Sequence, residues 1–369
     1  NARNSEPYDG RSPCVGYGTC KPVCPSGAKY SADHTVEAAE AKGVRVVDRA
    51  PVQRLETDAS GERVTAAVYA TNDDEVHRQE ADVFVLAAGG VENPRLLLLS
   101  RSEAHPDGLA NSSGAVGRYF MESPYAQISG ELDRPTGQHR IGFGTMESHQ
   151  FYEPEKATPG SFKIEFGNQA GPTITGLALA QRTPLNDLLD LARNPIDPAS
   201  IDRLGRNFEP VEWGNDLLES INDDYGSHFD IAAEIEVLPR AENRITLDDS
   251  ETDTFGNPVP DISWNRDPHA VRTIERAFDV LDRIVDGLDG DVKSKRQGVL
   301  WRGVGHHSGT TRMGEDSAES VVDADCRTHD VDNLTVASSS VFVNSGAMNP
   351  TLTIAALSLL AADHLDADL

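Results

Sequence analysis

The sequence predicts an α/β fold (α+β overall), in which a region of mixed strands and helices is interrupted by a region of antiparallel sheet. First, strand, glycine turn and helix follow one another before residue 100, and the apolar run Val83–Leu86 is typical of a strand buried in a parallel sheet. Second, short stretches of alternating hydrophobicity occupy the middle of the chain. Third, glycine turns and an apolar helix return near the end. The predicted domains are therefore 1–100, 101–298 and 299–369, and the last returns to the first.

The first 35 residues are rich in Gly, Pro and Ser and are expected to form loops. The stretch DHTVEAAEAKG predicts a helix with Asp33 or Thr35 as its N-cap and Gly43 at its C-terminal end. The segments VRVVD, PVQRLETD and RVTAAVYATN predict strands, with a turn at DASGE. Within EADVFVLAAGGVENPRLLLLS, Pro94 suits the first turn of a helix over Arg95–Ser100.

The middle region predicts an antiparallel sheet with one long helix. The stretches AQISGEL, SFKIEFG, TGLALAQ, HFDIAAEIEVLP and NRITLDD alternate as half-buried strands do. Between Pro268 and Gly287 the apolar residues recur at helical spacing and share one face, namely Val271, Ile274, Phe278, Leu281, Ile284 and Val285. A last helix is expected over Asn349–Leu365, and its apolar composition predicts that it is buried.

The charge limits the partners of the chain. Sixty acidic and 33 basic residues give a formal net charge of -27, which repels nucleic acid and anionic membranes. The acid is spread along the chain, and there are 7 Lys against 26 Arg, which favours a surface adapted to concentrated salt over an ordinary acidic protein. The longest apolar stretches are too short or too interrupted to span a bilayer, and no signal peptide is visible. The sequence as given therefore predicts a soluble chain, cytoplasmic or peripheral to a membrane.

Three of the four cysteines lie close together in CVGYGTCKPVC, as Cys14, Cys20 and Cys24. Structural zinc usually has four ligands in paired C-x2-C knuckles, and a disulfide would leave one thiol over. Three thiolates can instead hold an iron–sulfur cluster that lacks one corner iron, and the alternative is unligated thiols in a loop. The fourth, Cys326, is expected to be a small buried residue.

Several stretches together carry a family resemblance. They are VLAAGGVENPRLLLLS, GRYFMESP, AENRITL and the C-terminal HHSGTTRMGEDSAESVVDADCRTHDVDNLTVASSSVFVNSGAMNPTLTIAALSLLAADHL. These motifs resemble, in order, those of the glucose–methanol–choline family of flavin-dependent oxidoreductases, from about Cys14 onward. The resemblance implies a doubly wound FAD-binding domain, interrupted by an antiparallel-sheet substrate domain with helices. It also implies oxidation of a CH–OH group in an alcohol or sugar.

The resemblance implies two catalytic residues. His306 stands at the histidine of the family's H-x-x-G-T motif and would take the hydroxyl proton beside the flavin, a task that suits imidazole near neutral pH. Asn349, just before Pro350, stands where the family has a histidine or asparagine that orients the same oxygen. The simpler reading of His306 is a hydrogen-bonded structural histidine. By the same analogy, the adjacent His307 has no chemical role.

The cofactor contacts are implied in the same way. The helix after Pro350 would point its free N–H groups at the flavin, through backbone at Thr351 and Leu352. Ser338 and Ser339 resemble the segment beside the flavin diphosphate, although many members carry Asp where this chain has Ser338. Ser123 replaces a histidine found in relatives, which suggests a structural role. Three tryptophans could line a sugar site or belong to the core, namely Trp213, Trp264 and Trp301.

The cysteine spacing resembles that of flavin-dependent sugar dehydrogenases, whose three-iron cluster passes electrons to a cytochrome. An electron-acceptor protein is therefore expected. The alternatives are an oxidase that returns electrons to oxygen and a truncated, non-catalytic fragment. The truncated fragment is considered because no G-x-G-x-x-G turn opens a helix after a strand in this chain. The sequence predicts that about 150 further residues precede it and that the chain alone does not hold FAD.

Overall fold

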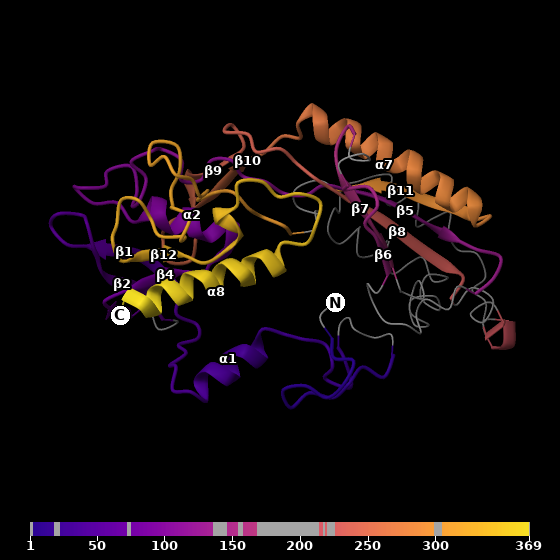
Figure 1. Ribbon diagram of the computed structural model, residues 1–369, viewed down its shortest axis with the longest axis horizontal. Coiled ribbons are helices and arrows are strands. Elements are labelled where there is room, and N and C mark those ends of the chain that lie inside the picture. The colour runs from indigo at the N-terminus through magenta and orange to yellow at the C-terminus, as the bar shows by residue number, and fades with distance from the viewer. Residues whose placement is uncertain are drawn as a thin grey trace.

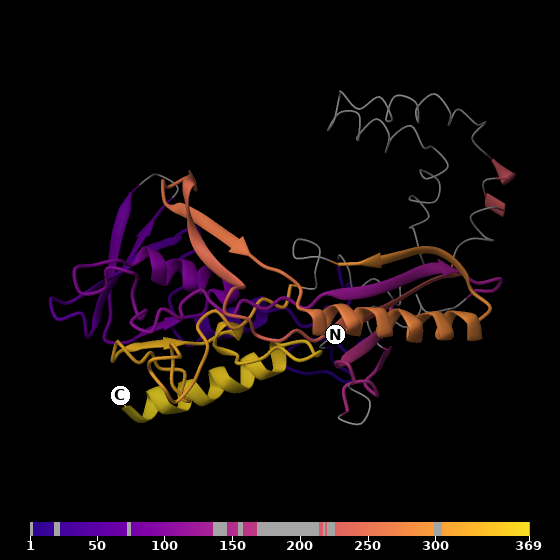
Figure 2. The same ribbon diagram turned by 90° about the horizontal axis from the view of Figure 1, so that it is seen from above.

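The computed structural model describes residues 3–17, 23–71, 75–135, 146–153, 158–167, 214–216, 218–219, 226–298 and 305–368. Figures 1 and 2 show an elongated molecule with two bodies side by side. One body holds helices α2 and α8 with several small sheets. The other is a larger sheet covered by helix α7. The architecture is mixed α/β with several sheets, which confirms the predicted fold class.

The first body pairs strands from distant parts of the chain. A three-stranded antiparallel sheet has the order β1-β2-β3, with β1 at Val52–Thr57, β2 at Val64–Ala70 and β3 at Val76–Glu80. Beside it, β4 (Phe84–Leu86) and β12 (Leu334–Val336) form a parallel pair. The side chain of Asn333 joins the two sheets, because its amide bonds the backbone N–H and C=O of Val64 at 2.9 Å each.

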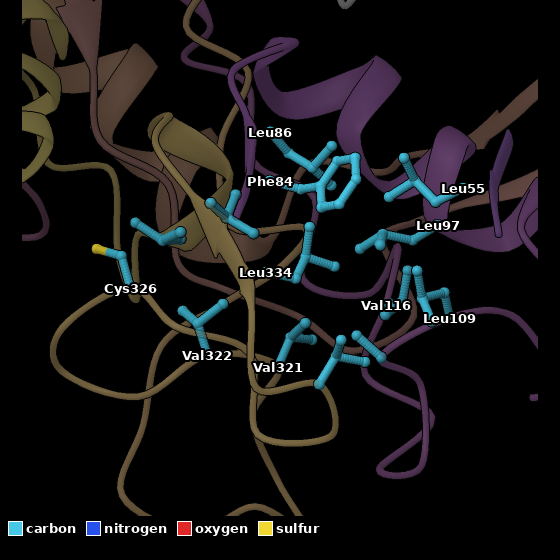
Figure 3. Close-up of a cluster of buried hydrophobic side chains, with 14 of the residues drawn as sticks. Leu55, Phe84, Leu86, Leu97, Leu109, Val116, Val321, Val322, Cys326 and Leu334 are labelled. Atoms are coloured by element: carbon cyan, nitrogen blue, oxygen red, sulfur yellow. The ribbon is translucent and has the colours of Figure 1, made fainter. Parts of the chain in front are cut away.

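The core of the first body combines side chains from β1, β2, β4 and β12. Figure 3 shows side chains from β4, β12 and α2 meeting in one cluster. Its buried members include Leu55, Phe84, Leu86, Leu97, Leu109, Val116, Val321, Val322, Cys326 and Leu334. Burial of such side chains contributes about 1.5–3 kcal/mol each relative to exposure. The cluster therefore holds residues 55–116 against residues 321–361.

Helix α2 spans Gly89–Leu99 and begins earlier than expected, so that Pro94 lies inside it. A proline has no N–H, so the carbonyl of Gly90 loses its bond within the helix. Thr310 replaces that donor, because its Oγ1 donates to the carbonyl of Gly90 at 2.7 Å. The carbonyl that Pro94 leaves free therefore links α2 to Thr310, in the glycine-rich loop that carries His306.

The second body is a five-stranded antiparallel sheet of order β11-β5-β8-β7-β6. Its strands are β5 (Tyr125–Glu131), β6 (Met146–Ser148), β7 (Phe162–Phe166), β8 (His228–Ile235) and β11 (Asp291–Gln297). Helix α7 (Pro268–Gly287) packs on one face, and its N-cap Asp267 accepts a hydrogen bond from the N–H of Ala270 at 2.8 Å. The core between them includes Ile128, Phe162, Ile164, Phe229, Ile231, Ile274 and Leu281. The opposite face of the sheet carries polar side chains and faces the candidate site.

The hairpin of β9 (Arg244–Thr252) and β10 (Pro258–Ser263) packs against α2 and not in the five-stranded sheet. Arg95 of α2 donates to Asp253 at 2.6 Å and to the carbonyl of Pro258 at 3.0 Å. These contacts tie part of the middle region to the first body. The division of the chain into domains 1–100, 101–298 and 299–369 stays a prediction.

Several local predictions were wrong. VRVVD is not a strand: Val44, Val46 and Val47 are about half exposed and have no ladder partner among the described residues. The last helix, α8 (Thr351–Asp368), is mostly exposed. Its apolar residues surround the helix, and only a stripe with Ala361 reaches the first core. Helix α1 (Asp33–Glu40) lies where the sequence predicted a helix, and it buries none of its side chains. Its N-cap is Ala32 and not Asp33 or Thr35, and no side chain caps it.

No helix in the described ranges is long and apolar enough to cross a membrane. The TGLALAQ stretch, expected as a strand, lies outside the described residues.

Candidate active site

The loop that carries His306 is anchored at several points of its backbone. The N–H of Gly305 donates to Oε1 of the buried Glu122 at 2.9 Å. Ser308 then pairs with Met121 in an isolated β-bridge, with both N–H to C=O distances at 3.0 Å. Gly309 has φ +87°, and a Cβ there would lie 2.4 Å from the carbonyl oxygen of Tyr119. The glycine is therefore required by both its conformation and the close approach of the neighbouring chain.

A second close approach lies on the other side of the same loop. A Cβ at Gly90 would lie 2.6 Å from the backbone carbonyl of His307. The loop is thus pressed against the start of α2, where Thr310 bonds the carbonyl of Gly90. These contacts fix the backbone on both sides of His306.

The structure brings His306 and Asn349 together. The Nδ2 of Asn349 lies 3.2 Å from Nε2 of His306, at hydrogen-bonding distance. The imidazole is largely buried, and burial, with the charges of Lys163 and His307, lowers the pKa of His306 to about 4. His306 is therefore neutral at pH 7 and its Nε2 is an acceptor, since the amide Nδ2 can only donate.

The other ring nitrogen of His306 faces a carboxylate. Its Nδ1 lies 3.8 Å from Oε2 of Glu234, and both atoms are buried without a hydrogen bond among the described residues. Burial raises the pKa of Glu234 to about 7, the negative charge of Glu165 adds to the rise, and Lys163 opposes it. Glu234 is therefore close to half protonated near neutral pH.

A lysine that the sequence interpretation missed lies next to this pair. The side chain of Lys163 on β7 is fully buried, and its Nζ donates to Oδ1 of Asn349. Nζ also contacts three carboxylates on β6, β7 and β8, those of Glu147 at 4.0 Å, Glu165, and Glu234 at 3.2 Å. Burial alone would lower the pKa of Lys163, but the bond to Glu165 and the nearby negative charges raise it. The ammonium therefore stays charged.

The residue after the candidate base has a different environment. His307 Nε2 lies 3.3 Å from Oε2 of Glu122, and its ring centroid lies 5.6 Å from that of Phe120. Burial lowers the pKa of His307. Glu122 thus contacts both Gly305 and His307, and it holds the loop in place on either side of His306.

The two serines expected beside FAD lie in a buried polar cluster. Asn93 of α2 donates through Nδ2 to the hydroxyls of Ser338 at 2.8 Å and Ser340 at 3.1 Å, and its Oδ1 accepts from the N–H of Ala88 at 2.8 Å. Ser339 starts the short 3-10 helix η3 (Ser339–Val341) and donates to the carbonyl of His307 at 2.6 Å. The hydroxyls of Ser338 and Ser339 therefore have partners inside the protein. We missed Asn93 in the sequence, where VENP shows only a helix start.

The beginning of α8 is open beside His306 and Asn349. Pro350 and Thr351 follow Asn349 directly, and the N–H of Ile354 donates to the carbonyl of Pro350 at 2.9 Å. Leu352 leaves 83% of its surface exposed. Figure 1 shows this end of α8 pointing toward the five-stranded sheet. Free N–H groups at a helix N-terminus favour negative charge, and an exposed apolar side chain offers a surface to a flat ring. These residues fit a flavin.

Two of the three clustered cysteines are described. Cys14 Sγ accepts from Nη1 of Arg3 at 3.3 Å, and Cys24 Sγ lies 3.6 Å from the hydroxyl of Ser26. The hydrogen bond from Ser26 lowers the pKa of Cys24 more than any other contact, which favours its thiolate. Cys20 lies outside the described residues, so the structure describes two of the three thiols expected to bind an iron–sulfur cluster.

Other residues singled out in the sequence have plainer environments. Cys326 is 1% exposed within the first core, as predicted, and burial raises its pKa. Ser123 is buried, and Trp264 is partly buried. Trp213 and Trp301 lie outside the described residues.

Comparison with known proteins identifies the family. Two family models, both described as GMC oxidoreductase, match residues 4–124 and 239–358. The fructose dehydrogenase large subunit of Gluconobacter japonicus is 33% identical over 368 residues, which cover 100% of this chain and 62% of the relative. The 2-methyl-1,2-propanediol dehydrogenase of Mycolicibacterium austroafricanum is 31% identical over 373 residues, covering 99% of this chain and 62% of the relative. The chain thus spans less than two thirds of the length of these relatives.

A solved structure supports the same fold. A formate oxidase of Aspergillus oryzae RIB40 superposes with a TM-score of 0.62 at 14% identity, over 91% of this chain and 63% of the other. At that identity the likeness concerns the fold alone. Both matched regions carry residues of the candidate site, because Glu122 lies in the first and His306 and Asn349 lie in the second. The chain belongs to the GMC oxidoreductase family.

Proposed function

We propose that this chain is the catalytic part of an FAD-dependent dehydrogenase that oxidises the CH–OH group of an alcohol or sugar. The observation that carries the proposal is a neutral, largely buried His306 with the exposed Asn349 3.2 Å away, at the open start of α8. Similarity to a fructose dehydrogenase and a diol dehydrogenase supports the substrate class.

His306 is the general base. Its Nε2 accepts the proton of the substrate hydroxyl, and Nδ2 of Asn349 donates to the same oxygen and orients it. The carbon loses a hydride as the hydroxyl loses its proton, so that a carbonyl compound leaves. FAD, when bound, accepts this hydride. Burial of the imidazole keeps it unprotonated before substrate arrives.

The same elements would hold the flavin. Pro350, Thr351 and Leu352 form the start of α8 beside the catalytic pair, where its N–H groups would stabilise negative charge on the flavin ring. Ser338 and Ser339 would lie near the diphosphate, and their buried hydrogen bonds hold that segment in place. The FAD of the Aspergillus formate oxidase, a protein of the same fold, is consistent with this cofactor.

We also propose that electrons pass to an acceptor protein, such as a cytochrome, through a three-iron cluster on Cys14, Cys20 and Cys24. The spacing of the thiols and the lowered pKa of Cys24 support this ligand set. The relative from Gluconobacter is a large subunit, which is consistent with a partner chain. Iron-free protein with full activity toward an artificial acceptor would remove the cluster from the proposal.

The acidic surface is proposed to be an adaptation to concentrated salt. A net charge of -27 and 7 Lys against 26 Arg support it. The host would then be a halophile.

The test of the proposed function is His306→Ala in the flavin-loaded protein. Without the base, flavin reduction by substrate should slow about 100-fold or more, while flavin stays bound. Stopped-flow measurement of flavin absorbance checks this, with a set of alcohols and sugars as donors. His77→Ala, at a partly exposed histidine on β3 that lies in a different sheet from the candidate site, is the matched control. Near-normal reduction in His306→Ala would contradict the proposal, and rapid turnover with oxygen would point to an oxidase.

A further inference from the structure

The starting observation is a buried lysine on the polar face of the five-stranded sheet. Phe162 and Ile164, its neighbours on β7, point into the core with α7. Lys163 therefore points to the other face, where its side chain is fully buried. Burying an ammonium group is costly unless it is paired and hydrogen-bonded.

The carboxylates around Lys163 satisfy its charge but do not account for its position. Glu147, Glu165 and Glu234 lie on three adjacent strands and contact Nζ. An ion network within one sheet would need no contact outside it. Lys163 nevertheless donates to Oδ1 of Asn349, a residue at the start of α8, which packs on the other core.

This contact selects one orientation of the Asn349 amide. An ammonium group has three donors and no acceptor, so it can bond only the oxygen of the amide. With Oδ1 held by Lys163, Nδ2 of Asn349 points to Nε2 of His306. In the flipped amide, Nδ2 would face the ammonium and an oxygen would face the imidazole acceptor, so both contacts would be repulsive.

We propose that Lys163 is a positioning residue, which fixes the side-chain amide of Asn349 with its N–H groups toward His306 and the substrate oxygen. The inference rests on the function proposed above. Lys163 contacts neither substrate nor flavin in this role. It acts through Asn349, and its carboxylate partners keep the cation in place.

The same ammonium group acts on His306 through its charge. The groups that face the imidazole are Lys163 on β7, Glu234 on β8, Asn349 before α8 and the adjacent His307. After burial, the charge of Lys163 is the next largest cause of the lowered pKa of His306. Removing this positive charge should therefore raise the pKa of His306.

The first variant is Lys163→Met in the flavin-loaded protein. Without the ammonium group, the Asn349 amide can rotate, and kcat should fall about 10- to 100-fold with a smaller change in KM. Ring 15N shifts of labelled histidine, followed by NMR against pH, should show a higher pKa for His306. Lys295→Met is the matched control, because this half-exposed lysine of the same sheet pairs with Asp282 of α7, away from the site.

Two further variants separate positioning from folding. Lys163→Met with Glu165→Gln removes a whole ion pair, so the buried charge stays balanced and the fold should be kept, yet kcat should stay low. In an Asn349→Ala background, Lys163→Met should lower kcat at most a few fold further, because no amide remains for Lys163 to orient.

The outcomes are distinct. If wild type reduces flavin but Lys163→Met matches Lys295→Met in kcat and in the pKa of His306, the positioning role is wrong. Full, multiplicative losses in the Asn349→Ala background would also overturn it. If none of the tested alcohols or sugars reduces the flavin of the wild-type protein, the proposed function fails. The NMR titration of His306 then still decides whether Lys163 controls the site.

Discussion

Two buried polar clusters lie on either side of the His306 loop, and they differ in charge. The cluster of Asn93, Ser338 and Ser340 is neutral, and each side chain has hydrogen-bond partners. The cluster around Lys163 and Glu234 is charged, and it leaves Oε2 of Glu234 without a hydrogen bond among the described residues. The neutral network holds the backbone beside the His306 loop in one position. The charged network controls the orientation of the Asn349 amide and the protonation of His306, and its cost in stability depends on pH.

Breaking the neutral cluster should have the largest effect on stability. Asn93→Ala removes bonds to Ala88, Ser338 and Ser340 and leaves a cavity at a fully buried position. We expect about 4 kcal/mol of lost unfolding free energy, since each buried polar group left unsatisfied costs about 1–3 kcal/mol. Urea unfolding of the variant measures it. Asn265→Ala, at an exposed asparagine, is the control. A loss below about 1 kcal/mol in Asn93→Ala would show that water replaces the amide.

Breaking the charged cluster should have a smaller effect that depends on pH. Burial raises the pKa of Glu234 from its usual 4.5 to about 7. The folded-state pKa lies above the unfolded one, so the carboxyl favours folding below pH 4.5, and that contribution is lost as pH rises through 7. Relative to Glu234→Gln, wild type should therefore lose about 3 kcal/mol between pH 4 and pH 8.

Urea unfolding of wild type and Glu234→Gln across this pH range tests the sign. Glu131→Gln, at a carboxyl on β5 of the same sheet whose side chain is 36% exposed, is the matched control. A stability difference between wild type and Glu234→Gln that is independent of pH would mean that water reaches the carboxyl.

Salt should have the smallest effect on both clusters. Exposed charges are screened within tenths molar salt, whereas buried ones are screened much less. If the acidic surface is a salt adaptation, the melting temperature should rise on going from tenths molar to several molar salt. The pKa of His306, followed by NMR, should change little over the same range. A melting temperature indifferent to salt would count against the adaptation.

The sequence predicted those features that depend on local pattern. Alternation located β5, β7 and β8, and helical periodicity located α7, because burial on one face leaves a fixed spacing. The family motifs predicted that His306 and Asn349 share one site. In the structure, Nδ2 of Asn349 lies 3.2 Å from Nε2 of His306. Their roles stay a prediction.

The missed features depend on contacts between distant segments. Lys163 lies on an alternating strand, but the pattern does not show that Glu234 pairs beside it or that Asn349 reaches it from the other body. VRVVD has the composition of a strand, yet a strand also needs a partner. The apolar residues of α8 predicted burial, but they surround the helix, and a core can cover only one side.

The bond between Lys163 and Asn349 also joins two separately packed bodies. Lys163 is held by the core of the five-stranded sheet, and Asn349 is fixed by α8 on the other core. A relative displacement of the two bodies by about 1 Å would break this hydrogen bond, which tolerates only a few tenths of an ångström. A molecule that wedges the bodies apart could therefore inhibit the enzyme without entering its active site. Such an inhibitor would be noncompetitive with the proposed alcohol or sugar substrate.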